Sequence, residues 1–139
     1  MNGDTIGAEE PIRYAFCGDG AHYCLDAAHG PWNEIREAAE AAYDRTSACR
    51  FTSFVAYEWS LTPGSVNLHR NVIFRNAVVP QVPTSSLDVR TPEALWERLH
   101  ADCLDAGTGC DVLAIPHNSN LSAGRMRAVM PRSPAPPQD

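Results

Sequence analysis

The most constraining feature of the chain is a strict two-residue alternation over residues 67–75. Successive side chains of a β-strand point to opposite faces, so this pattern predicts a strand with two unlike faces. One face would carry Leu68, Arg70, Val72 and Phe74, and the other Asn67, His69, Asn71, Ile73 and Arg75. Four of the five side chains in the second set are polar, which is unusual for the wall of a core. That face is therefore a candidate for function.

The flanking segments predict the order helix, strand, strand, helix, strand. Residues 31–45 are expected to form the first helix, with Pro31 at its first position. Its apolar stripe would consist of Trp32, Ile35, Ala39 and Ala42. Residues 51–59 are rich in aromatic and β-branched side chains and predict a strand. Residues 13–30 contain no such pattern, and we expect them to be irregular but packed.

The second helix has a clear start signal. Thr91 is a suitable N-cap, Pro92 suits the first helical position, and Glu93 places an acid in the first turn. The helix is expected to run to about Ala106, with Gly107 as the left-handed residue after it. Residues 111–116 are almost wholly apolar, which is typical of a parallel strand covered on both faces. Parallel α/β arrangements place functional side chains at the carboxyl ends of the strands.

Length and charge exclude several classes of protein. A chain of 139 residues suits one domain, and a net charge of −6 argues against nucleic-acid binding. No apolar run is long enough to span a membrane, and no secretory signal is recognisable, so the default expectation is a cytoplasmic protein. Residues 1–12 are expected to be loose. Four of the eleven prolines fall in the last nine residues, so residues 125–139 are expected to be a disordered tail.

Five cysteines leave at least one unpaired within the chain. The pairs Cys17/Cys24 and Cys103/Cys110 each enclose six residues, a spacing that permits a disulfide where the chain turns. Burial of these residues as small hydrophobic side chains is an equal alternative. For Cys103 and Cys110 we predict Cα atoms within disulfide reach, because a Gly-Thr-Gly turn separates a helix end from a strand start.

Three ionisable residues are candidates for a shared site. Glu58 is near a strand end, His69 is on the polar face of the next strand, and His117 follows the last strand. Carboxylate and imidazole groups suit zinc, manganese or iron. Their sequence separations match no local metal motif, so solvated or hydrogen-bonded roles remain the alternative. We expect no nucleotide cofactor and no nucleophilic triad, because the corresponding motifs are absent from the sequence.

Several of these segments resemble a bacterial family called domain of unknown function 3604. The similar strings are residues 54–60, 67–76, 95–96 and 102–122, and the resemblance covers residues 13–124. Members are several times longer than this chain and resemble metal-dependent phosphoesterases of the polymerase-and-histidinol-phosphatase (PHP) type. That resemblance implies an α/β fold, namely a distorted β/α barrel with metal ions at the strand ends, of which this chain would be an incomplete internal part.

The same resemblance assigns roles to the three candidates. Glu58 matches a metal-bridging carboxylate, His69 the His that follows it, and His117 the His of a short strand-end motif. The His-x-His and Asp-x-His motifs of PHP proteins are absent. The implied function is a fragment of a metal-dependent hydrolase of small-molecule substrates, inactive by itself. The alternatives are a non-catalytic remnant or small interaction domain with structural His and Glu residues, and a secreted disulfide module.

Overall fold

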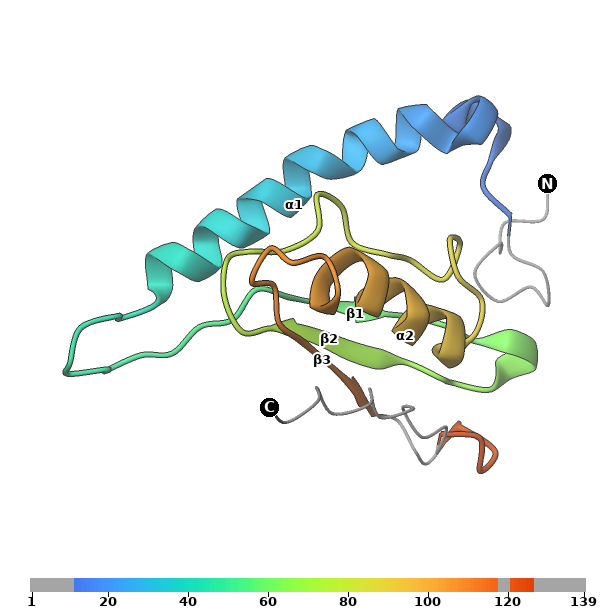
Figure 1. Ribbon diagram of the computed structural model, residues 1–139. Coiled ribbons are helices and arrows are strands. Elements are labelled where there is room, and N and C mark those ends of the chain that lie inside the picture. Colours follow the sequence, from blue (N-terminus) through green and yellow to red (C-terminus); the bar gives the residue numbers. More distant parts are fainter. Residues whose placement is uncertain (1–11, 118–120, 127–139) are drawn as a thin grey trace, which may run out of the picture.

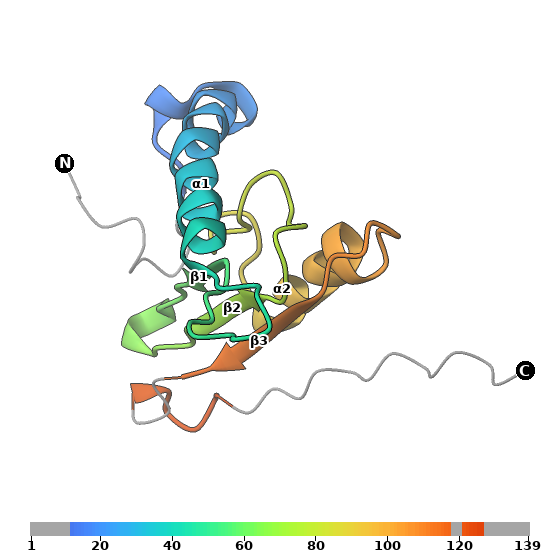
Figure 2. The same cartoon turned by 90° about the vertical axis from the view of Figure 1, so that its left-hand side faces the viewer.

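Two helices and a three-stranded sheet make up the fold. The computed structural model describes residues 12–117 and 121–126. The elements follow the order α1 (His22–Ala42), β1 (Ala56–Trp59), β2 (Arg70–Phe74), α2 (Pro92–Leu99) and β3 (Val112–Pro116). The sheet order is β1-β2-β3, and both neighbouring pairs are antiparallel. Both helices lie on one side of the sheet, so its other side carries no described helix (Figures 1 and 2). We call the helix-free side the outer face.

The alternation in β2 is confirmed. Its four predicted inward side chains, Leu68, Arg70, Val72 and Phe74, are all buried on the helix side. Leu68, Val72 and Phe74 pack in one cluster with Trp59 of β1 and with Leu95 and Leu99 of α2. The ladder itself is shorter than predicted: residues 70–74 pair with β3, and residues 70–73 also pair with β1. Likewise only Ala56–Trp59 of the predicted strand 51–59 is β-structure.

The second helix begins where the sequence predicts. The Thr91 hydroxyl accepts a hydrogen bond of 3.1 Å from the Ala94 backbone N–H, and Pro92 occupies the first turn. After Leu99 the helix continues as a π-helical turn over His100–Leu104. Gly107 has a φ of 68°, in agreement with its predicted left-handed conformation. The α-helical part is therefore shorter than predicted. The helical segment as a whole still ends shortly before Gly107, as the sequence predicts.

The predicted start of the first helix is wrong. The helix α1 begins at His22, so Pro31 lies inside it, and only residues 13–21 of the segment expected to be irregular are non-α-helical. A disulfide between Cys17 and Cys24 ties the preceding turns to the first turn of the helix. The predicted stripe is only half right, because Trp32 and Ala39 are buried whereas Ile35 is exposed.

The predicted environment of the last strand is also wrong. Strand β3 is antiparallel to β2, and it lies at the edge of the sheet. Its side chains on the outer face are open to solvent: Leu113 is 64% exposed and Ile115 is 44% exposed. An apolar run of five residues cannot by itself distinguish a strand buried on two faces from one with an uncovered apolar face. The described residues form an open antiparallel sheet, and this part of the chain contains no barrel.

Two disulfides close the predicted loops. Cys17–Cys24 and Cys103–Cys110 each have a Cα–Cα distance of 5.0 Å, which confirms the prediction for the second pair. Cys49 is exposed and free. The predicted loose segment 1–12 and tail 125–139 fall outside the described residues, apart from residues 12, 125 and 126.

Candidate functional site

The strand register brings the three predicted residues together on the outer face. Glu58 lies opposite Asn71 in the β1–β2 ladder, and the backbone N–H of His117 donates to the carbonyl of His69 at 3.4 Å. Opposed residues in an antiparallel pair share one face, and so do residues two apart in a strand. The end of β1, the start of β2 and the end of β3 therefore meet at one corner of the sheet. We expected parallel strands to do this, but antiparallel pairing brings the residues together instead.

The Glu58 carboxylate lies between the two imidazole rings. His69 Nδ1 is 2.9 Å from Glu58 Oε1, and His117 Nε2 is 3.3 Å from Glu58 Oε2. The two ring centroids are 5.8 Å apart. Both nitrogens are buried, and neither has a hydrogen-bond partner of good geometry among the described residues; the contacts with Glu58 are ion pairs only when the imidazoles are protonated. We call Glu58, His69 and His117 the Glu–His cluster.

A fourth polar residue of this corner, Ser60, was not predicted. Its hydroxyl donates a hydrogen bond of 2.6 Å to Glu58 Oε1. Ser60 is two residues after Glu58, so both side chains can point to the same face, and this spacing was the available signal. The bond from Ser60 lowers the pKa of the Glu58 carboxyl; burial opposes this effect, and the neighbouring His69 and His117 reinforce it. The cluster therefore holds a carboxylate that stays ionised in mildly acidic solution.

The cluster meets some of the requirements of a metal site. Imidazole nitrogen and carboxylate oxygen are the usual ligands of zinc, and two donors on a tetrahedral zinc ion are about 3.3 Å apart. Each Glu58–His contact is close to that spacing. However, no group of three or more His, Cys, Asp or Glu side chains within residues 12–117 and 121–126 is placed to hold a metal ion. The donor types and the two orphaned nitrogens fit a cation, but the three groups as they stand do not enclose one.

Two of the other described histidines, His22 and His100, make their contacts elsewhere in the chain. His100 contacts Asp105 at 3.2 Å, and His22 Nδ1 is 2.9 Å from the carbonyl oxygen of Asp19. Each contact is local in the chain, within five residues.

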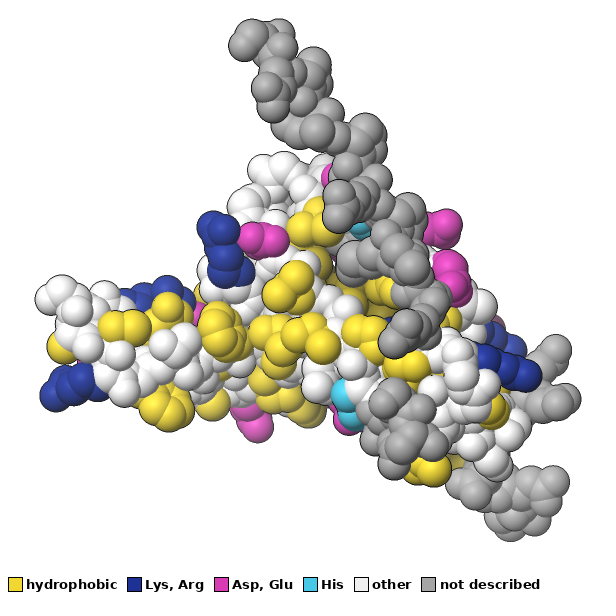
Figure 3. Space-filling view, turned by 90° about the horizontal axis from the view of Figure 1, so that it is seen from below, with side chains coloured by type: hydrophobic (Ala, Val, Ile, Leu, Met, Phe, Trp, Pro, Cys, Tyr) yellow, Lys and Arg dark blue, Asp and Glu magenta, His cyan; other side chains and the backbone are white. Residues whose placement is uncertain are grey.

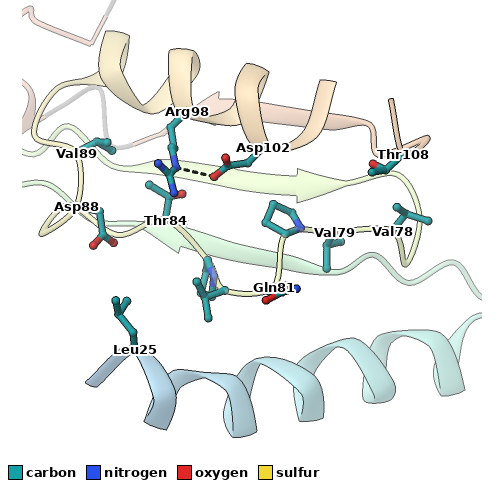
Figure 4. Close-up of a pocket in the computed structure, with 13 residues that line it drawn as sticks. Leu25, Val78, Val79, Gln81, Thr84, Asp88, Val89, Arg98, Asp102 and Thr108 are labelled. Atoms are coloured by element: carbon teal, nitrogen blue, oxygen red, sulfur yellow. Dashed lines mark ion pairs between the residues drawn. The ribbon is translucent and has the colours of Figure 1, made fainter. Parts of the chain in front are cut away.

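A separate hollow lies on the helix side of the sheet. It has a volume of about 600 Å³ and lies between α1, residues 78–89 and α2. Leu25 faces it from α1, and the Arg98–Asp102 ion pair faces it from α2 and the π-helical turn that follows (Figure 4). The Glu–His cluster lines no part of it, because the cluster is on the outer face. We therefore do not assign this hollow to the candidate site.

The sequence of the chain matches one protein family over almost its whole length. The match covers residues 7–136 and is to the family described as protein of unknown function (DUF3604). The chain belongs to this family. The match continues through the proline-rich residues after Gly124, so our expectation that the family resemblance ends there is wrong. No curated protein and no solved structure matches the DUF3604 chain.

Proposed function

We propose that this DUF3604 chain supplies part of the metal site of a metal-dependent hydrolase of the phosphoesterase type, and that it does not hydrolyse such substrates by itself. The observation that supports the proposal is the Glu58 carboxylate held between His69 Nδ1 and His117 Nε2. The distorted β/α barrel of PHP-type enzymes, and the status of this chain as an internal fragment of one, are parts of the same proposal.

Each residue would have a separate task. His117 and His69 would present ring nitrogens to the ion, and Glu58 would add a negative charge that offsets the charge of the metal. Ser60 would fix the carboxylate, because its hydrogen bond of 2.6 Å holds Oε1. A bound metal ion supplies a water of lowered pKa and stabilises negative charge on a phosphoester. The proposed substrate is a small molecule, and zinc, manganese and iron are the proposed ions.

The open position of the cluster explains why we expect little activity from this chain alone. The Glu58 side chain is 45% exposed, so water reaches the cluster. Electrostatic effects are weaker in such a wet site than in an enclosed one. Metal ligands also need supporting groups that fix their orientation, and Ser60 is the hydrogen-bonding support that we identify for Glu58.

The test combines metal titration with an assay. Calorimetric titration with Zn²⁺ or Mn²⁺ should show weak binding that His117→Ala abolishes and His100→Ala preserves, since His100 lies outside the cluster. A chromogenic phosphoester should be hydrolysed no faster than background at any metal concentration. Equal metal binding by the two variants would disprove the metal site. Metal-dependent turnover that disappears in His117→Ala would instead show that the chain carries a complete site.

The alternative is a non-catalytic remnant or small interaction domain whose His and Glu residues are structural. The direct approach of Glu58 to both imidazoles favours it, because the three groups can then stabilise one another without an ion. Under this alternative, His117→Ala would lower the free energy of unfolding equally with and without added metal. Under the metal-site proposal, added Zn²⁺ would raise the unfolding temperature of the wild type and not that of the variant.

The disulfides bear on where the protein works. No helix among the described residues is long and apolar enough to cross a membrane. The sequence alone predicts a cytoplasmic location by default, but the two disulfides favour an oxidising compartment instead. Of the two locations, we propose the oxidising one, since disulfides are rare in cytosolic proteins.

A further inference from the structure

The edge of β3 that faces away from β2 carries backbone groups that pair with no other strand of the described sheet. The Arg75 N–H donates to Asp111 O at 3.0 Å, and the His117 N–H donates to His69 O. Residues 111, 113, 115 and 117 therefore direct their backbone groups toward β2. Backbone groups alternate along a strand, so those of Val112 and Ala114 point away from the sheet. In the described sheet no strand pairs with this edge.

We propose that two copies of this chain pair antiparallel along β3, about a two-fold axis at Leu113. Val112 of one copy then pairs with Ala114 of the other, and the same pairing repeats on the other side of the axis. Among the residues that the structure describes, no other strand pairs with the N–H or the carbonyl of Val112 or Ala114, so the pairing forms four backbone hydrogen bonds. Pro116, which has no N–H to donate, lies outside this short ladder.

The outer face supplies apolar contact area at the same position. Leu113 is 64% exposed, and it lines an apolar hollow of about 410 Å³ together with Phe54 and Ile73. Figure 3 views the molecule from the side opposite α1 and shows hydrophobic side chains gathered across it. The two-fold axis places the two Leu113 side chains directly opposite each other, where they shield one another from water.

This register brings no like charges together. Asp111 lies at one end of β3 and His117 at the other, and the strand between them, Val112–Pro116, carries no charge. Antiparallel pairing about Leu113 brings the Asp111 end of each copy to the His117 end of the other. The carboxylate then lies diagonal to the imidazole, at a separation of about 7–8 Å between backbones. Native edge strands commonly carry inward-pointing charges that prevent such pairing, and β3 has none.

The first test is oligomeric state. Sedimentation velocity over a concentration series should show a monomer–dimer equilibrium for the wild type and only monomer for Leu113→Asp, because two carboxylates would face each other at the axis. Leu121→Asp is the matched control, since Leu121 is 56% exposed and lies outside the strand. It should dimerise like the wild type. A wild type that stays monomeric up to its solubility limit, or equal behaviour of the two variants, would overturn the proposal.

A second pair of variants keeps the proposal testable if Leu113→Asp misfolds. Ala114→Pro removes only an outward N–H, and edge strands tolerate proline at such positions. It should be monomeric with an unchanged circular dichroism spectrum. In a Cys49→Ser background, Leu113→Cys should form an intermolecular disulfide on mild oxidation, and Leu121→Cys should not. A dimeric Ala114→Pro protein, or equal cross-linking of the two cysteine variants, would contradict the two-fold axis at Leu113.

Discussion

A single hydroxyl lowers the pKa of the carboxyl group in the Glu–His cluster. Ser60 donates to Glu58 Oε1 at 2.6 Å, and this bond is the main cause of the lowered Glu58 pKa. Replacement by alanine removes a bond made to the charged form, so the pKa of Glu58 should rise in Ser60→Ala. Carboxyl carbon chemical shifts followed against pH would measure it. Ser53→Ala, outside the cluster, should leave the titration unchanged, and an unmoved Glu58 pKa in Ser60→Ala would show that the hydroxyl is irrelevant.

Trp32 is the side chain that attaches α1 to the sheet. It is 1% exposed, its indole N–H donates to the carbonyl of Pro80 at 2.8 Å, and its ring meets Tyr57 and Phe74 edge-on. Trp32→Ala should lower the free energy of unfolding by about 3–5 kcal/mol, the usual cost of deleting a buried Trp. Urea unfolding would measure the change. Ile35→Ala, at an exposed position of the same helix, should change it little.

The residues of the Glu–His cluster could be identified from the sequence, but the sheet register that brings them together could not. Polar side chains on an alternating strand point to one face whatever the sheet topology, so His69 was identifiable, and Glu58 and His117 followed from their places at strand ends. Ser60 was missed because a serine in a loop has many structural uses. The register that joins these residues depends on pairing between segments far apart in the chain, and no local pattern encodes it.

At the scale of elements, helix α2 was predictable because its start signal is local. The Thr91 cap, Pro92 and the buried Leu95 and Leu99 all lie within a few turns. Thr91→Ala should cost about 1 kcal/mol of unfolding free energy, because the Ala94 N–H loses its acceptor. Thermal or urea unfolding would measure the cost. Thr91→Ser keeps the hydroxyl and should retain most of the stability; an equal loss in both variants would mean that the cap bond contributes nothing.

Helix α1 and strand β3 were mispredicted because tertiary constraints override their local patterns. Pro31 is a common first residue, yet α1 starts nine residues earlier, after turns closed by the Cys17–Cys24 disulfide. The apolar run of β3 fits a covered strand equally well, and only its neighbours determine what faces it. The parallel pairing inferred from this run is wrong, because β2 and β3 are antiparallel.

The two disulfides can be tested by counting free thiols. Titration of the denatured, unreduced protein with a thiol reagent should find one thiol per chain, that of Cys49. After reduction the count should be five. Since Cys103 joins the end of the α2 segment to Cys110 before β3, reduction should also lower the unfolding temperature. Five thiols in protein isolated without reductant would show that the pairs do not form in the cell.

Across the whole molecule, stability should decline in acid. Asp44 accepts bonds from Thr46 and Arg50, which lower its pKa. Burial raises the pKa of Asp88, but bonds from Ser85 and Arg13 outweigh this effect, and its pKa, like that of Glu58, is lowered overall. A carboxyl with a lower pKa in the folded state stabilises the fold above its unfolded pKa of about 4, and this contribution is lost as pH falls through the folded value.

The unfolding temperature should therefore be nearly constant from about pH 7 to pH 5, as far as these carboxyls determine it, and should fall below that range. Asp88→Asn would remove one contribution, so the variant should be less stable than the wild type at neutral pH and lose less stability on acidification. The two curves should converge at low pH. Asp26→Asn, on the surface of α1, is the control and should follow the wild type. Parallel curves for Asp88→Asn and the wild type would show that Asp88 titrates alike in the folded and unfolded chain.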